Sequence, residues 1–501
     1  MTDKLTEQTQ SRLTSLSTLI ITGLIAVLSA FTANARAEKS QFATATCSKV
    51  MQDIYNIDSE AFAADIRGVG TSSRDERART AFLREYMALM QYTAANNQKN
   101  YDAFFAASDA AFGAISGSKY EDNLSCWLHI HKCMVYIYDG SMLSGGIQFW
   151  KSYRAFKSAE DKYAAYDGQL PLRGIYNVIL SQIPEKWKSL AGFFGFGEGD
   201  IATGFNQIEQ YRRKVQNIAG LNDEAVMFSF ANMFFSFEQN MPADIMKAIR
   251  ENDAPAVRYA YILSCGRSQN GEAAYESLQA TPGDVLNRFP LLYHQKGKYA
   301  LRRLEPDEAI KWGKRFAETY SGVSNKNGVY VDMAYAYMLK GDRKSAKAMV
   351  DKCLSIKSDF DIDRRATEEA PLVMDTPMEI LRARLNFEYG KFAEAEKELK
   401  SYRPRQKDLA EYYFRLGRAT DKQGKYGEAM KWYDKAMSQS ANSTRYFGPY
   451  AAVHAAEICV KKKDKAGADG YLGKARKLNN GEYKKELDQR IELTERVVKK
   501  M

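Results

Sequence analysis

Small residues recur at a fixed interval among the hydrophobic positions of the second half of the chain. In five places, a glycine or alanine within an apolar helical pattern is followed twelve residues later by an alanine. The five pairs are Gly297–Ala309, Ala334–Ala346, Ala383–Ala395, Gly417–Ala429 and Ala456–Ala468. After four of these alanines, further packing residues follow at four and seven positions, which places them on the same helix face. The pattern predicts pairs of helices that cross closely at the small residues.

The clearest copy of this pattern lies between residues 413 and 436. It consists of Tyr413, Leu416, Gly417, Gly424, Tyr426, Ala429, Tyr433 and Ala436. Its glycine follows the small residue of the preceding copy by 34 residues, whereas the other intervals are 37, 49 and 39 residues and require insertions between helices. The pattern resembles the tetratricopeptide repeat, a helix–turn–helix unit with this period. The resemblance implies an all-α fold, a right-handed superhelical stack of antiparallel helix pairs, or α-solenoid, that usually binds other proteins.

The first half of the chain is helical by the same criterion, but its repeat pattern is indistinct. Residues 74–95 carry large apolar side chains at helical spacing, and no alternating run is long enough to predict a sheet. A further twelve-residue interval, from Ile262 to Ala274, indicates that the repeats begin near residue 250.

These patterns divide the chain into four predicted segments. They are a signal peptide at 1–37, an irregular N-terminal helical domain with degenerate repeats at 38–245, a tetratricopeptide-like array at 246–480, and a charged capping helix at 481–501. A polar terminal helix is expected because the stack must end in water.

The N-terminal segment has the order of a secretory signal peptide. A polar stretch precedes an apolar run from Leu19 to Phe31, and small residues follow up to Ala37. The run of thirteen residues is shorter than the roughly 20 that a spanning helix needs. We therefore expect an exported protein, periplasmic or associated with the cell envelope; an uncleaved N-terminal anchor is the alternative.

The charge balance is basic, with 72 Lys and Arg against 62 Asp and Glu. Removal of residues 1–37 leaves 69 − 60 = +9. This excess favours acidic partners or an anionic membrane surface, and export argues against nucleic acid. The chain has only four histidines, which leaves little material for acid–base or metal chemistry. We predict no cofactor, no metal site and no catalytic activity.

One cluster, His129, His131 and Cys133, has ligand-like residues. On a helix, His129 and Cys133 share a face while His131 points away, so the three cannot hold one zinc ion. Cys126 and Cys133 are separated by about 10 Å of helical rise, too far for a mutual disulfide. In an exported protein we expect Cys47 to pair with one of them.

The most distinctive segment of the first half is rich in glycine. It carries Gly-x-Tyr-Asn-x-x-x-Ser-x-x-Pro at 174–184, then Gly195-Phe196, Gly199-Asp200 and Gly204. Over roughly residues 140–210 the chain resembles the tetratricopeptide repeat protein 39 family, whose yeast relatives are described as outer-membrane-associated. Its Gly-Phe-Gly-Glu-Gly-Asp is one residue longer than the family element, and Ile201 stands where a basic residue is usual. The resemblance implies an all-helical scaffold without a known catalytic site.

Aromatic residues of the same segment allow two interpretations. The side chains concerned are Trp187, Leu190, Phe193, Phe194 and Phe196, beside Lys186 and Lys188. They suit either a hairpin buried between stacked helices or a patch at a membrane interface. We favour the buried hairpin because aromatic residues at helical spacing are usually part of a core.

Residues next to each small crossing position, or one turn away, predict a partner-binding groove on the inner face of the stack. They are Lys298, Arg302, Tyr335, Met338, Arg384, Phe387, Phe414, Arg418, Lys422, Glu457 and Lys461. Cations between aromatic rings suit an extended peptide with acidic side chains or a free carboxylate. The alternative is that several of these residues contact only the next helix.

The sequence thus indicates an exported scaffold that mediates protein–protein interactions in the cell envelope, with a protein or peptide as its partner. The alternative function is that of a peripheral membrane or lipid-associated helical-repeat protein.

Overall fold

The structure, a computed structural model, consists of helices apart from one short strand pair. It describes residues 33–35, 37–39, 41–163, 166–183, 185–235, 243–358, 360–440, 443–499 and 501. The predicted signal peptide therefore lies almost entirely outside the described residues. Strand β1 (Ala33–Ala35) pairs antiparallel with β2 (Ala37–Lys39), with Ala33 opposite Lys39. Helices make up most of the described residues, which confirms the predicted all-α class.

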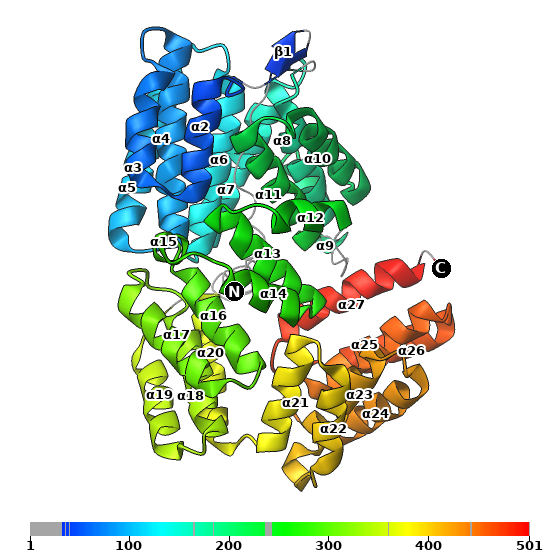
Figure 1. The fold of residues 1–501 in the computed structure, drawn as a ribbon. Coiled ribbons are helices and arrows are strands. Elements are labelled where there is room, and N and C mark those ends of the chain that lie inside the picture. The colour runs from blue at the N-terminus through cyan, green and yellow to red at the C-terminus, as the bar shows by residue number, and fades with distance from the viewer. Residues whose placement is uncertain are drawn as a thin grey trace, which may run out of the picture.

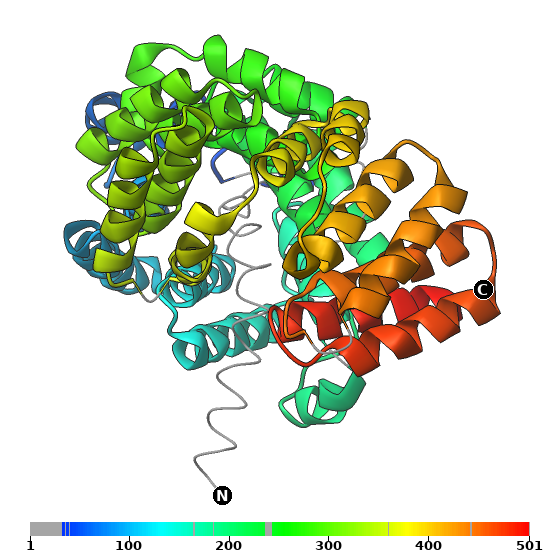
Figure 2. The ribbon, with the colours of Figure 1, turned by 90° about the horizontal axis from the view of Figure 1, so that it is seen from below.

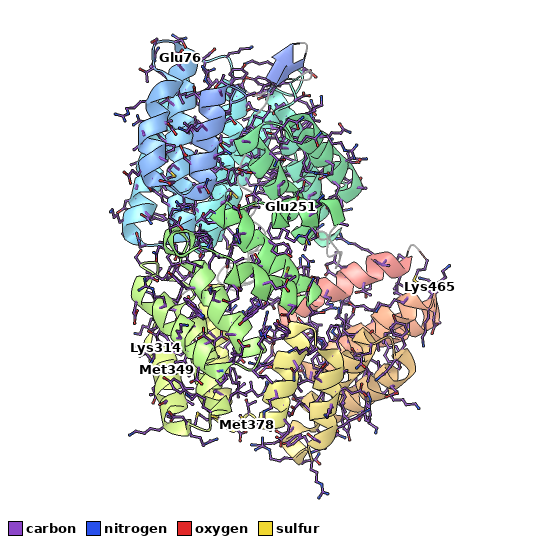
Figure 3. All side chains as sticks on the ribbon, viewed as in Figure 1. Glu76, Glu251, Lys314, Met349, Met378 and Lys465 are labelled. Atoms are coloured by element: carbon purple, nitrogen blue, oxygen red, sulfur yellow. The ribbon has the colours of Figure 1, made fainter. Side chains whose placement is uncertain are left out.

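The N-terminal half is built of antiparallel helices, drawn in blue to green in Figure 1. Its elements are α2 (Ala45–Asn56), α3 (Ser59–Asp65), η1 (Ile66–Val69), α4 (Arg74–Ala94), α5 (Gln98–Ile115), α6 (Glu121–Tyr138), α7 (Met142–Ser158), α8 (Gln169–Ser181), α9 (Glu185–Phe193), α10 (Ile201–Val215), α11 (Ala219–Phe235) and α12 (Ala243–Arg250). Helix α4 packs on α5, α6 on α7, and α8 on α10. A capping box begins α4: the Ser73 hydroxyl accepts from the Glu76 amide, and the Glu76 carboxylate accepts from the Ser73 amide. Glu76 is labelled near the top of Figure 3.

The second half contains the predicted helix pairs. Its elements are α13 (Pro255–Ser268), α14 (Gly271–Gln279), α15 (Gly283–Arg288), α16 (Leu291–Arg302), α17 (Pro306–Thr319), α18 (Lys326–Leu339), α19 (Arg343–Ser355), α20 (Asp361–Glu369), η2 (Ala370–Asp375), α21 (Met378–Tyr389), α22 (Phe392–Ser401), η3 (Gln406–Asp408), α23 (Leu409–Lys422), α24 (Tyr426–Gln439), α25 (Phe447–Lys461), α26 (Lys465–Leu478) and α27 (Lys484–Lys499). In each predicted pair, the small residue lies on the first helix and the alanine on the second. The helices pack as α16 on α17, α18 on α19, α21 on α22, α23 on α24 and α25 on α26.

The small residues allow the paired helices to approach closely. A Cβ atom added to Gly417 would lie 2.5 Å from two ring carbons of Tyr433, a side chain that is fully buried on α24. One added to Gly297 would lie 3.3 Å from the carbonyl oxygen of Ala309. Larger residues at these positions would push the helices apart, which explains the twelve-residue frame.

The interval of 49 residues corresponds to an insertion of α20 and η2 between two helix pairs. Helix α20 packs against α18, and η2 packs against α19. The next helix, α21, belongs to two cores: Leu381, Leu385 and Tyr389 join the large core that begins at Phe42, whereas its other face joins a small core shared with α23. A separate core covers α23–α27. Figure 2 shows the resulting curved arrangement from below.

The last helix, α27, packs against both α25 and α26. It buries Leu487, Ile491 and Val498, and leaves its charged residues on the other faces. The predicted boundaries at residues 245 and 480 stay predictions. In the described part of the chain, no helix combines the length and the apolar character that crossing a bilayer requires.

The expected disulfide from Cys47 is wrong, because all six cysteines are free and buried. Cys126 lies beside Tyr176 of α8, and Cys133 faces α7. Cys47 lies at the start of α2, where its backbone amide donates to the side chain of Thr44. The thiols therefore face different neighbours. Burial raises the pKa of each of these three thiols, which disfavours the thiolate needed for disulfide exchange.

Candidate partner-binding groove

The predicted groove residues all lie on the first helices of their pairs, α16, α18, α21, α23 and α25. Their apolar members are buried between helices: Tyr335 is 1% exposed, Met338 5%, Phe387 7% and Phe414 2%. Their charged members keep some contact with solvent, and Lys422 and Lys461 are exposed. The apolar residues therefore pack the helices together, and the cations carry the chemistry of the surface.

Ion pairs connect the first helices across the stack. Arg302 of α16 lies 3.0 Å from the Glu388 carboxylate on α21, and Arg384 lies 3.8 Å from the same carboxylate. Burial raises the pKa of Glu388, but the positive charges of Arg302 and Arg384 outweigh it and lower that pKa to about 2. Glu388 thus stays ionised between two arginines.

Arg384 also reaches the inserted helix. Its guanidinium lies 2.5 Å from the Glu369 carboxylate at the end of α20, which in turn accepts a hydrogen bond of 2.7 Å from the Tyr335 hydroxyl. The guanidinium lies over the Tyr335 ring, 4.4 Å from its centroid. Arg384 therefore joins α18, α20 and α21, so this predicted groove residue also holds the helices together.

A cavity of about 310 Å³ opens beside these ion pairs. It is bounded by α20, η2, α21, α23 and the turns before α25 and α27. Four ion pairs line it: Arg384–Glu369, Lys407–Asp375, Arg415–Glu411 and Arg445–Glu482. Aromatic rings from Tyr335, Tyr446, Phe447 and Tyr483 complete its wall. Its volume is at the lower end of the range typical of ligand sites.

Arg418 differs from the other groove arginines. Its guanidinium lies over the Phe387 ring, 4.1 Å from the centroid, and 5.7 Å from that of Phe414. Among the described residues it forms no ion pair, and burial lowers its pKa. Together with Arg384 and Arg415 it lines a second, smaller cavity next to the first. Arg418 is thus a cation held in place by rings and not neutralised by a carboxylate.

The remaining predicted residues lie at the two ends of the row. Glu457 is held 2.7 Å from Arg490 of α27 and 2.9 Å from His454, so its charge is already compensated. Lys461 lies 3.4 Å from Asp421, and Lys298 is half-buried on α16. The structure brings Arg384, Arg418 and Arg415, which was not predicted, to the smaller cavity. Glu457, Lys461 and Lys298 lie outside both cavities.

Several cavity residues were not predicted from the sequence. Arg415 could have been predicted, because it follows Glu411 by one helical turn and precedes Arg418 by three residues, which places the three on one side of the helix. Glu369 comes from the insertion, and Arg445 and Glu482 come from turns, so none of them has a place in the repeat pattern.

The ligand-like cluster of the first half is divided among neighbouring helices. His129 is hydrogen-bonded to Gln148 of α7 at 2.7 Å, and Cys133 also faces α7. His131 lies on the opposite side, fully buried, 2.8 Å from the Glu85 carboxylate of α4. The three side chains therefore serve the packing of α6.

The favoured burial of the aromatic residues after Pro184 is wrong at two positions. Phe193 is 83% exposed and Phe194 is 51% exposed, because the end of α9 and the turn after it place them outside the helix stack. Phe196 follows the expectation and packs on Phe149. The side chains of Trp187 and Leu190 lie outside the described residues.

Comparison with known proteins agrees with the repeats. A family model described as a tetratricopeptide repeat matches residues 328–360, which cover α19 and most of α18, and residues 410–443, which cover α24 and nearly all of α23. No curated protein matches the chain. Neither finding supports the finer resemblance of residues 140–210 to the tetratricopeptide repeat protein 39 family.

Among solved structures, the chain is similar to one described as the crystal structure of the APC/C hetero-tetramer Cut9–Hcn1. The two share 13% sequence identity, over 91% of this chain and 94% of that chain, with a TM-score of 0.24. A TM-score this low carries no conclusion about function. The fold and the family model together show that the chain contains tetratricopeptide repeats in an all-helical stack.

Proposed function

We propose that the chain is an exported, non-catalytic scaffold that binds an acidic segment of a partner protein beside Arg418. Tetratricopeptide repeats generally bind protein partners, which supports the general class. The observation that carries the finer proposal is the state of Arg418, a half-buried guanidinium without a carboxylate among the described residues. A carboxylate of the partner would complete this site with charge-assisted hydrogen bonds.

The charge of the surrounding helices favours an acidic segment. The five first helices carry ten Lys and Arg against six Asp and Glu, an excess of four positive charges. The larger cavity shares Arg384 and Arg415 with the smaller cavity that Arg418 lines. Its wall contains both ion pairs and aromatic rings, so it suits the polar backbone and side chains of a peptide better than a purely apolar ligand. The peptide would run along α23 from the cavity toward Lys422.

Export is proposed on the order of polar, apolar and small residues at 1–37. Expression of the full chain in a bacterium and mass spectrometry of the envelope protein test it. We expect a mature chain that begins at Glu38. A chain that retains residues 1–37 and stays in the membrane fraction would instead support the uncleaved anchor.

Selection from a random peptide library tests the binding proposal. Peptides enriched on the wild-type chain should be rich in Asp and Glu, and Arg418→Gln should abolish that enrichment. Arg382→Gln, an equal charge change at an exposed position of α21, is the matched control and should leave it unchanged. Arg384 is unsuitable for this purpose because it holds Glu369 and Glu388. Enrichment of basic or purely apolar peptides would refute the proposal.

A further inference from the structure

An exposed apolar patch lies on the N-terminal half, formed by α7, the last residue of α9 and the turn that follows α9. On α7, Leu143 is 76% exposed and Ile147 is 45% exposed, one helical turn apart, and Trp150 continues the same row. Phe193, the last residue of α9, and Phe194, in the turn that follows, extend it, because the Phe194 backbone contacts Trp150. We call these five residues the α7–α9 patch. Contiguous apolar surfaces of this kind mark interaction sites.

The patch is held in place by contacts between the turn and α7. The Trp150 indole donates to the Phe194 carbonyl oxygen at 3.1 Å, and the Gly197 amide donates to the Tyr153 hydroxyl at 3.1 Å. The Phe196 ring stacks on Phe149 with centroids 5.7 Å apart. Because the turn is fixed at both ends, Phe193 and Phe194 are presented outward from a preformed base.

Cations border the patch. Lys151 is exposed next to Trp150, and the Arg154 guanidinium lies over the Trp150 ring, 4.8 Å from its centroid. Lys188 lies on α9, 3.7 Å from the exposed Glu198 carboxylate. In the described part of this region, three positive charges thus accompany one negative charge. Aromatic and aliphatic side chains bordered by Lys and Arg fit the boundary between acyl chains and anionic headgroups.

We propose that the α7–α9 patch rests on an anionic lipid surface, with Phe193 and Phe194 inserted among the acyl chains and Lys151 and Arg154 near the headgroups. The two phenylalanines project from the end of α9 and the turn that follows it, which lets them enter a fluid layer without any rearrangement of α7. The opposite side of α7 is buried, with Met142, Tyr153 and Phe156 in the core, so only this face is available. The patch lies outside the groove cavities, so this proposal does not depend on peptide binding.

Vesicles made of phosphatidylcholine with brominated acyl chains and phosphatidylserine test this contact, because bromine quenches nearby tryptophans. We expect quenching of the full-length chain, including Trp150, and much less of it when phosphatidylserine is omitted. The double variant Phe193→Ser, Phe194→Ser should bind at least about tenfold more weakly, since it loses most of the inserted apolar area. Both side chains are exposed, so its melting temperature should not change.

Leu354→Ser is the matched control, since it removes another exposed apolar residue, 45% exposed, on the distant helix α19. It should be quenched like the wild type. An unquenched wild type, or equal quenching of the double variant, would overturn the proposal. The proposal would also be overturned if the wild type is a dimer that does not bind vesicles and the double variant is a monomer. A second copy of the chain would then cover the patch.

Discussion

Arg496, near the end of α27, donates a hydrogen bond of 3.1 Å to the backbone carbonyl oxygen of Ser181 at the end of α8, 315 residues earlier. The same guanidinium lies 3.4 Å from the Ile183 carbonyl oxygen. At its other end, α27 is held by an ion pair of 2.8 Å between Glu486 and Arg365 of α20. The last helix therefore links the repeats to the N-terminal half, as its position between the two in Figure 1 shows.

Replacement of Arg496 tests this link. Arg496→Gln removes a cation from the carbonyl end of α8, where positive charge is favourable, and its charged hydrogen bonds with it. We expect the amides in the second half of α27 to exchange about tenfold faster, as measured by hydrogen–deuterium exchange. Lys499→Gln, the same charge change on an exposed residue, should leave the exchange unchanged. Equal exchange in both variants would show that Arg496 does not hold α27.

Two glycines give opposite predictions: Gly417 lies at the close crossing of α23 and α24, and Gly473 lies on α26. Gly417→Ala should lower the free energy of unfolding by about 1–3 kcal/mol, because its Cβ would meet the Tyr433 ring at 2.5 Å. That ring is fully buried and stacks on His454, so it has little room to move.

Gly473→Ala, within α26 and with no atom near its added Cβ, should raise the free energy of unfolding by up to about 1 kcal/mol. Denaturant titrations of both variants provide the measurement. Stabilisation by Gly417→Ala would contradict the packing of the repeat frame.

The Glu388 carboxylate, between Arg302 and Arg384, makes the free energy of unfolding depend on pH. Its folded-state pKa of about 2 lies below the ordinary value of 4.5, so its contribution is complete above pH 4.5 and disappears as the pH falls toward 2. Glu388→Gln should lower the free energy of unfolding at pH 7 by about 1–2 kcal/mol, a value reduced for solvent screening because the side chain is 35% exposed.

The difference between Glu388→Gln and the wild type should narrow as the pH is lowered from 4.5 to 3, in urea titrations at each pH. Glu379 lies on the same helix and forms no ion pair with a described residue. Glu379→Gln should therefore differ from the wild type in free energy of unfolding by a small amount that does not change with pH. A Glu388→Gln effect that does not change with pH would argue against the ion pairs.

The sequence predicted the helix pairs because their signal is local and periodic. Gly417 and Ala429 stand where two backbones must approach, and such positions are readable from spacing alone. The same rule placed Arg384 and Arg418 on the first helices of their pairs, where both line the smaller cavity; that they bind a partner stays a prediction. The rule could not predict that Phe387 and Phe414 are buried while the neighbouring cations reach solvent, because it selects both kinds of residue by the same spacing.

Contacts between distant segments were not predictable in this way. The insertion at α20 was expected from the interval of 49 residues, but nothing in its sequence shows that Glu369 would meet Arg384 at a cavity. The contact of Arg496 with Ser181 uses a backbone oxygen, which has no sequence signature. The exposure of Phe193 and Phe194 depends on how the end of α9 and the turn after it lie on α7, and helical periodicity does not contain that information.

The central claim is that Arg418 binds an acidic segment of a partner. The most direct measurement is the dissociation constant, by isothermal titration calorimetry, of an acidic peptide selected on the wild-type chain. Loss of one charged hydrogen-bond partner predicts binding at least about tenfold weaker for Arg418→Gln, with wild-type affinity for Arg382→Gln. Equal affinities of the two variants for this peptide would contradict the claim.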